Sequence, residues 1–182
     1  MAGAVLDRTV LQKLIYTRLE QLKAAESDLR IAYPWDTIPG SDDADGGGDD
    51  VKAIVQLVAV DVRETPRQQG PSSWGGGGSE PATAAITLAF TCVAPERGVE
   101  GGTLLSTESW IYRLEQAMSV VVSYFAEQGI TSGSHSGWVL EMDQAETSVD
   151  HDPDSPALRS GGVVVTGTAT RESGTSVTAV PE

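Results

Sequence analysis

Hydrophobic and polar positions alternate along the chain with two different periods, and the longer period predicts two helices. From about Asp7 to Ala25 the apolar residues recur every three to four positions with charged residues between them, which is typical of an amphipathic helix. The same spacing extends from Trp110 to Phe125. For this second helix we expect an N-cap at Ser106 or Thr107 and a C-terminal end at Gly129.

The shorter period, in which every second residue is apolar, predicts five strands. Their approximate limits are Leu29–Tyr33, Val51–Arg63, Ala82–Val93, Gly137–Ala145 and Gly162–Arg171. In the second strand large apolar residues fall on both parities, which favours a strand covered on both faces over part of its length. The third strand places its large side chains on one parity, so one of its faces belongs to the core: Ile86, Leu88, Phe90 and Cys92.

Segments rich in glycine, proline, serine and aspartate separate these elements and predict flexible loops. The loops cover residues 36–50, 64–82 and 146–160, and residues 172–182 are expected to be a frayed C-terminus. The predicted fold is a single α+β domain over residues 1–182, in the order α-β-β-β-α-β-β. An antiparallel or mixed sheet of four to five strands packs against the two helices, with long protruding hairpins.

Charge and hydropathy exclude several classes of function. The 182 residues include 12 basic and 26 acidic side chains, a formal net charge of −14, which argues against electrostatic binding of DNA. Twelve of the acidic residues lie in two segments, 36–50 and 141–154. The chain has no apolar run of the roughly 20 residues that cross a bilayer and no signal-like N-terminus. We therefore expect a soluble protein that is not exported and does not contact membranes.

Residues capable of catalysis are scarce. Cys92 is the only cysteine and lies on the apolar parity of its strand, which favours a small buried hydrophobe over a nucleophile. His135 and His151 fall in predicted turns and are expected to be solvated. The chain contains no phosphate-binding loop or nucleophile elbow. We therefore expect no enzyme activity, no cofactor and no metal.

The aspartate-rich loop from Asp42 to Asp50 begins with a pattern that resembles the start of a calcium-binding loop. The twelfth position counted from Asp43 is Ile54, however, where an EF-hand requires a bidentate glutamate. A solvated loop is therefore the default interpretation, and cation binding remains the alternative. The residues concerned are Asp42, Asp43, Asp45, Asp49 and Asp50.

Three side chains in the long connections are candidates for contacts with other molecules. Arg67 and Trp74 belong to the 64–82 hairpin, and Arg159 belongs to the 146–160 hairpin. A tryptophan in a flexible loop often anchors a partner, although Trp74 can equally pack back onto its own sheet. Arg67 is either the partner of an acidic neighbour or a solvated charge.

The order of the elements and their general character resemble those of one known family. The chain combines an N-terminal helix (LDRTVLQKLIYTRLEQL), two long strands around an extended hairpin (VKAIVQLVAVDVRETPRQQG, then ATAAITLAFTCVAP) and a second helix (ESWIYRLEQAMSVVVSYF) with a closing hairpin. This arrangement is similar to the tail terminator proteins of long-tailed phages and phage-derived contractile injection systems.

The resemblance implies a structural protein without a catalytic group. It implies a homohexameric ring that caps the tail tube, stops tube growth and offers a docking surface to the neck. The implied partners are further copies of the chain, the tail tube protein, and head–tail connector, neck or sheath proteins, while DNA passes through as unbound cargo. The protein would be assembled in the host cytoplasm and reside in the tail or neck of the virion.

Other interpretations remain open at this stage. The segment from Asp42 to Asp50 has no counterpart in the family, so its place in a ring is not assigned. Another head–tail connector or a neck or tail completion protein is the nearest alternative. A metal-binding enzyme and a small adaptor module are more distant ones.

Overall fold

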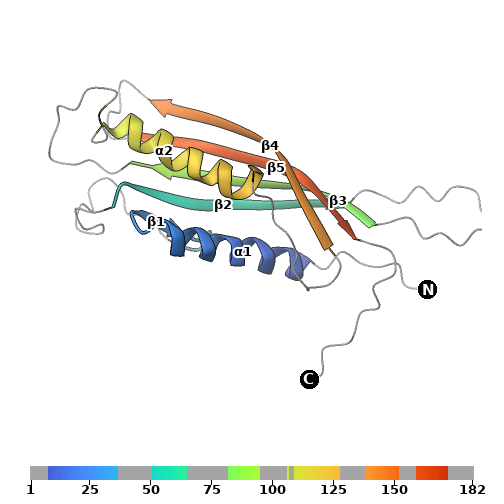
Figure 1. Ribbon diagram of the computed structural model, residues 1–182. Helices are drawn as coiled ribbons and strands as arrows, with labels where there is room; N and C mark the ends of the chain where they lie inside the picture. The colour runs from blue at the N-terminus through green and yellow to red at the C-terminus, as the bar shows by residue number, and fades with distance from the viewer. Residues whose placement is uncertain are drawn as a thin grey trace, which may run out of the picture.

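The computed structural model describes residues 8–36, 51–64, 82–94, 106, 109–127, 138–151 and 159–171. Its elements follow the predicted order and form a mixed α+β fold with one five-stranded sheet (Figure 1). They are α1 (Arg8–Ala25), β1 (Leu29–Ala32), β2 (Ala53–Glu64), β3 (Ala82–Val93), α2 (Trp110–Val122), the π-helical turn η2 (Ser123–Glu127), β4 (Trp138–His151) and β5 (Arg159–Arg171).

The strands are ordered β1-β2-β3-β5-β4 across the sheet. β1 runs parallel to β2, with Leu29 opposite Ala53, and every other pair is antiparallel. The short β1 and the long β4 are therefore the two edges of the sheet.

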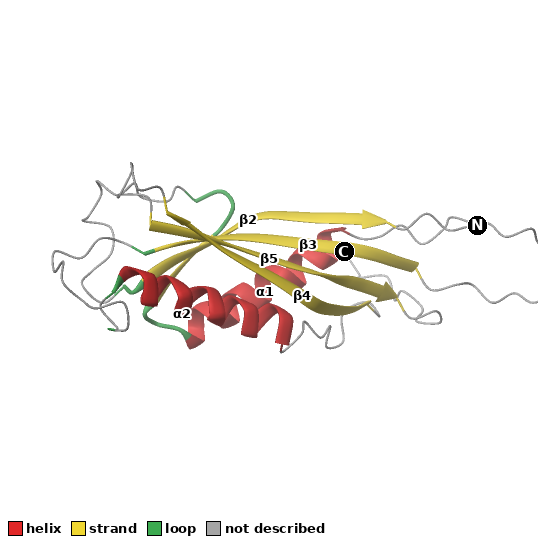
Figure 2. Cartoon of the chain, turned by 90° about the horizontal axis from the view of Figure 1, so that it is seen from above, coloured by secondary structure: helices red, strands yellow, loops and turns green. Residues whose placement is uncertain are grey.

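Both helices cover the same face of the sheet (Figure 2). The apolar stripe of α1 is fully buried through Leu11, Ile15, Leu19 and Leu22, and α2 contributes Leu114, Ala117 and Val121. The expected core face of β3 is confirmed, since Ile86, Leu88, Phe90 and Cys92 are all buried. The opposite face of the sheet carries no helix among the described residues.

A β-bulge in β2 explains why large apolar residues fall on both parities of this strand. Ala53, Ile54 and Val55 at its start are all buried, so β2 is covered on both faces over part of its length, as expected. Leu57 pairs with Phe90 and Ala59 pairs with Ala89, so Val58 is the extra residue and is half exposed. The bulge reverses the parity of the positions that follow it. The valines after Val58 consequently face the helices, as do Val55 and Leu57 before it.

The N-cap of α2 differs from the predicted one. Its N-cap is Ser109, which makes no side-chain capping hydrogen bond. Ser106 instead accepts the Ser109 N–H through its main-chain carbonyl at 2.9 Å. At the other end the α-helix gives way after Val122 to η2, which keeps Phe125 buried against Phe90. Thr107 and Gly129 lie outside the described residues.

The closing hairpin is longer than predicted. β4 continues to His151 and β5 begins at Arg159, so much of the expected flexible segment 146–160 is ordered strand. Residues 144–150 are all exposed, and hydrophobic periodicity therefore gave no sign of them. The ladder of backbone hydrogen bonds to β5 defines this half of β4.

Candidate interaction surfaces

The first candidate surface is the β4 edge, which we define by Glu141, Glu146, Val149 and Asp150. Among the described strands, β4 pairs only with β5. The 14 residues of β4 include four carboxylates and no lysine or arginine. A free sheet edge presents backbone N–H and carbonyl groups alike, and the carboxylates make this edge acidic.

The second candidate surface is the aromatic turn at the opposite edge, made of Tyr16, Tyr33 and Trp35. The rings of Tyr33 and Trp35 are stacked with centroids 5.0 Å apart, and Tyr16 from α1 meets both rings edge-on. Trp35 is nonetheless 67% exposed. An exposed tryptophan at a defined position is the type of residue that contributes strongly to protein interfaces.

Hydrogen bonds hold the backbone beneath Trp35 in place. The Asp36 carboxylate accepts the Tyr33 N–H at 2.8 Å, and the Asp36 N–H donates to the Tyr33 carbonyl at 3.0 Å. The Gln56 side-chain amide donates to the carbonyls of Tyr33 and Asp36 at 3.0 and 2.9 Å. Hydrogen bonds fix the turn at both ends. Binding of a partner to Trp35 would therefore cost little further conformational entropy of the backbone.

Sequence analysis missed the aromatic turn. It assigned Tyr33 to the end of a strand and Asp36 to the start of a flexible loop. The available signal was the pair of aromatic residues on either side of Pro34, because proline favours tight turns. The contribution of Gln56 requires the β1–β2 register and is not visible in the sequence.

Arg159 is the only one of the three predicted interface side chains that the structure describes. Its guanidinium carbon lies 5.8 Å from the centre of the Trp110 ring, and its carbonyl accepts the Ala94 N–H. Arg159 therefore helps to hold α2 on the sheet within one chain. Arg67 and Trp74 lie outside the described residues, as do Asp42, Asp43, Asp45, Asp49 and Asp50.

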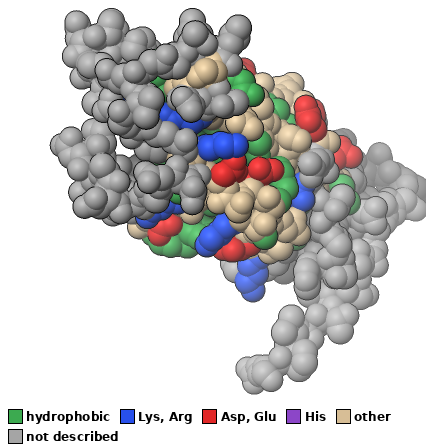
Figure 3. Space-filling model, turned by 60° about the vertical axis from the view of Figure 1, so that its left-hand side comes forward, with side chains coloured by type: hydrophobic (Ala, Val, Ile, Leu, Met, Phe, Trp, Pro, Cys, Tyr) green, Lys and Arg blue, Asp and Glu red, His purple; other side chains and the backbone are tan. Residues whose placement is uncertain are grey.

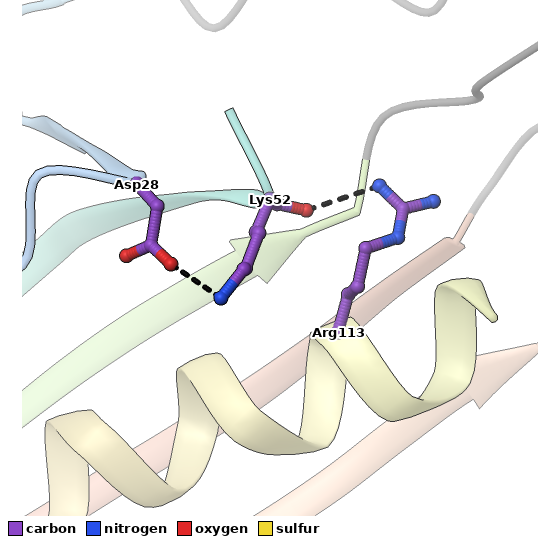
Figure 4. Close-up of polar contacts among 3 residues, drawn as sticks. All are labelled: Asp28, Lys52 and Arg113. Carbon is purple, nitrogen blue, oxygen red and sulfur yellow. Dashed lines mark hydrogen bonds and ion pairs between the residues drawn. The ribbon is translucent and has the colours of Figure 1, made fainter. Parts of the chain in front are cut away.

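A polar cluster at the N-terminal end of α2 joins three elements (Figure 4). The buried Arg113 donates from Nη1 to the Lys52 carbonyl at 3.1 Å. The Lys52 ammonium in turn forms an ion pair with Asp28 at 2.5 Å. Figure 3 likewise shows basic and acidic side chains close together on this end of the molecule. The contacts of Arg113, Lys52 and Asp28 stabilise the fold of a single chain and do not by themselves indicate a binding site.

Cys92 is completely buried, which confirms its interpretation as a small hydrophobic residue. Burial raises the pKa of its thiol to about 12, so the nucleophilic thiolate is not formed near neutral pH. His135 and the side chain of His151 lie outside the part of the chain that the structure describes. Among the described residues no group of three or more His, Cys, Asp and Glu side chains is placed to hold a metal ion.

None of the described helices is long and apolar enough to cross a membrane. Comparison of the chain with protein-family models and with curated protein sequences finds no match.

Proposed function

We propose that this chain is a structural protein of a phage tail or a phage-derived injection system, and specifically a tail terminator. Copies of the chain form a ring on the last layer of the tail tube, block the addition of further tube subunits, and provide the surface on which the neck docks. The protein acts through its surfaces and does not catalyse a reaction.

The observation that carries the proposal is the order of the elements. The seven helices and strands on which the resemblance rests occur in the predicted order around one sheet. Both helices cover one face of the sheet, while the edges formed by the short β1 and the long β4 and the opposite face carry no further described element. These edges and this face leave surface available for contacts between subunits, which a ring protein needs.

Charge supports the same function. DNA must pass through a terminator ring without adhering to it, and a subunit with a formal net charge of −14 repels the phosphate backbone. Attraction between subunits must then come from local complementarity, since their net charges repel one another.

The test is assembly of the purified chain. Size-exclusion chromatography with light scattering should give a mass about six times that of the chain, and negative-stain images should show rings. Added to growing tail tubes, the protein should bind tube ends and stop elongation. A connector would instead bind the portal and leave tube growth unchanged. A chain that remains a single molecule and turns over a substrate would contradict the proposal.

The connection between β2 and β3 offers a second test. Deleting Gln69 to Gly78 leaves residues 65–68 and 79–81, which are sufficient to join two antiparallel strands. We expect the shortened chain to fold normally and to assemble less well. The control replaces residues 69–78 by glycine and serine at unchanged length, which separates the effect of side chains such as Trp74 from that of length. Unchanged ring formation by both variants would rule out a role for this hairpin in assembly.

A further inference from the structure

We propose that β4 binds an extended, basic segment of another protein, which joins the five-stranded sheet as an additional strand beside the β4 edge. The segment forms a backbone ladder with β4 and ion pairs with the carboxylates of this edge. This inference goes beyond the proposed function, because the addition of a strand to one copy of the chain does not require a ring.

The backbone of the outer half of β4 is suited to accept a strand. β4 lies at the margin of the sheet (Figure 1) and pairs with β5 alone among the described strands. Its register with β5 is continuous from Gln144 to His151, after the bulge at Asp143, and residues 144–150 are all exposed. Alternate residues of such an edge direct both an N–H and a carbonyl group outward, which is the arrangement that an incoming strand needs.

The carboxylates of this half of β4 lie on the face of the sheet that carries no described helix. Glu146 pairs with Val164 and Asp150 pairs with Ser160, so each carboxylate stands beside an uncharged residue of β5. The ion pairs found in the described part of the chain include neither of them. Basic side chains on an added strand would supply the countercharges, since opposite charges on paired strands attract.

The helix-covered side of the same edge is uncharged. Thr147 and Val149 pair with Val163 and Gly161, which are both buried. Gly161 lies against α2, because a Cβ atom added to it would meet the Met118 Sδ at 2.7 Å. Val149 is 41% exposed, so an apolar side chain opposite it would extend the core at this edge.

The two faces of the β4 edge together define the sequence of the bound segment. The residues opposite Glu146 and Asp150 are four positions apart, so the segment carries two basic side chains with this spacing. The residues opposite Thr147 and Val149 point to the other face and are apolar. The segment therefore follows the pattern basic, apolar, polar, apolar, basic in an extended conformation.

A second copy of this chain does not offer such a segment. Among its 12 basic residues only Arg63 and Arg67 are four positions apart. Arg63 already belongs to β2, where it pairs with Asp61, and Pro66 has no N–H to contribute to a ladder. Two β4 edges would also repel each other through their carboxylates. The partner is therefore a different protein.

The probe for the experiment is a fluorescently labelled peptide with this pattern, Ser-Thr-Lys-Val-Thr-Val-Lys-Thr-Ser, added to the full chain. We expect saturable binding in fluorescence anisotropy, and slower hydrogen exchange of the amides in residues 144–150 when the peptide is bound. The affinity should fall as the salt concentration rises, because the ion pairs are exposed to solvent.

Two peptides of the same charge separate strand addition from general attraction to an acidic protein. The first, Ser-Thr-Val-Lys-Thr-Lys-Val-Thr-Ser, exchanges the lysines with the neighbouring valines and so moves the charges to the helix-covered side. The second carries N-methyl groups on the central threonine and the valine after it, which removes one backbone donor from each edge of the peptide. Each should bind roughly tenfold more weakly than the probe.

Two variants of the protein test the carboxylates. Glu146→Gln with Asp150→Asn removes both charges and keeps the shapes of the side chains. Both positions are exposed, so this variant should fold as the wild type does and bind the probe roughly tenfold more weakly. The matched control, Glu20→Gln with Glu115→Gln, removes two exposed charges from α1 and α2 and should bind as the wild type does.

The outcomes separate this inference from the proposed function. No binding at millimolar peptide would show that the carboxylates only keep other strands away from the edge, and would overturn the inference. Equal binding of the three peptides, or an equal loss in both variants, would show unspecific attraction between charges and would overturn it as well. The proposed ring is measured on the chain alone, so a chain that binds the probe but forms no rings would contradict only the proposed function.

Discussion

The guanidinium of Arg113 donates a hydrogen bond to the main-chain carbonyl of Lys52, which is 61 residues earlier in the chain. Arg113 is only 2% exposed. The bond ties the first turn of α2 to the residue that precedes β2. Because the Lys52 N–H donates to the Asp28 carbonyl and its side chain pairs with the Asp28 carboxylate, the same point is also tied to the turn between α1 and β1.

Replacing Arg113 with methionine should destabilise the protein. The substitution keeps most of the buried volume but leaves the Lys52 carbonyl without this donor, which typically costs about 1–3 kcal/mol. Urea unfolding followed by circular dichroism measures the loss. Arg63→Met is the matched control, because the Arg63 side chain is 82% exposed and its removal should change stability by less than about 0.5 kcal/mol. Equal midpoints for the two variants would show that the Arg113 contact adds no net stability.

Gly167 should tolerate no side chain. A Cβ atom there would collide with the Glu141 carbonyl and approach the Met142 Cα to 2.6 Å, beside the bulge of β4. Backbone cannot move aside as a flexible side chain does, so Gly167→Ala should cost about 1–3 kcal/mol or more. Gly162→Ala is the control, because its Cβ would meet the Ser148 Oγ at 3.1 Å and that side chain can rotate. A thermal midpoint for Gly167→Ala no lower than that of Gly162→Ala would contradict this account.

The sequence was sufficient to predict the elements that bury a periodic apolar face. The stripe from Leu11 to Leu22 and the alternation from Ile86 to Cys92 each match a buried surface. Hydrophobic burial selects such patterns directly, and their period identifies the type of element. The order of the elements and the α+β class followed from them.

Features determined by pairing between distant residues were not predictable in this way. The bulge at Val58 changes which valines face the core, and it is defined only by the register with β3. The outer half of β4 is polar and exposed, so only its ladder with β5 reveals it. The Trp35 turn depends on Gln56, which is brought close by the parallel β1–β2 pair. Both candidate surfaces therefore come from tertiary contacts that leave little trace in local sequence.

Burial of the Cys92 thiol should contribute a pH dependence to the unfolding free energy, and this contribution should appear only in alkaline solution. Its pKa rises from 9.0 to about 12 in the folded state, so the unfolded chain releases the thiol proton first. The contribution is complete below pH 9 and is lost between pH 9 and about 12, by roughly 1 kcal/mol of unfolding free energy per pH unit. Cys92→Ala should lack this slope. Parallel alkaline profiles for the two proteins would contradict the assignment.

The thiol should also be chemically inert while the protein is folded. At pH 8 iodoacetamide should modify Cys92 only as fast as the chain opens, and urea should accelerate the reaction sharply. Mass spectrometry of the alkylated protein measures the rate. Rapid modification without denaturant would show that the strand around Cys92 is accessible in the folded state.

Arg18 should stabilise the packing of α1 against η2 through the shape of its guanidinium as well as its charge. Its Nε donates to the Tyr124 carbonyl at 3.0 Å and its Nη1 donates to Gln21 at 2.8 Å, while the group lies 4.9 Å from the centre of the Tyr124 ring. A lysine keeps the charge but not this fork of donors. Arg18→Lys should therefore lower the unfolding free energy by about 1 kcal/mol, whereas Lys13→Met, at an exposed position of the same helix, should have little effect.

A double-mutant cycle with Tyr124→Leu separates the two contributions of Arg18. The leucine removes the aromatic ring but leaves the main-chain carbonyl that accepts the hydrogen bond. If the hydrogen bond dominates, Arg18→Lys should cost nearly the same with leucine at position 124 as with tyrosine. If the ring contact dominates, the cost should fall by about 0.5 kcal/mol or more. No loss of stability in either background would show that α1 is held by its buried leucines and Ile15 alone.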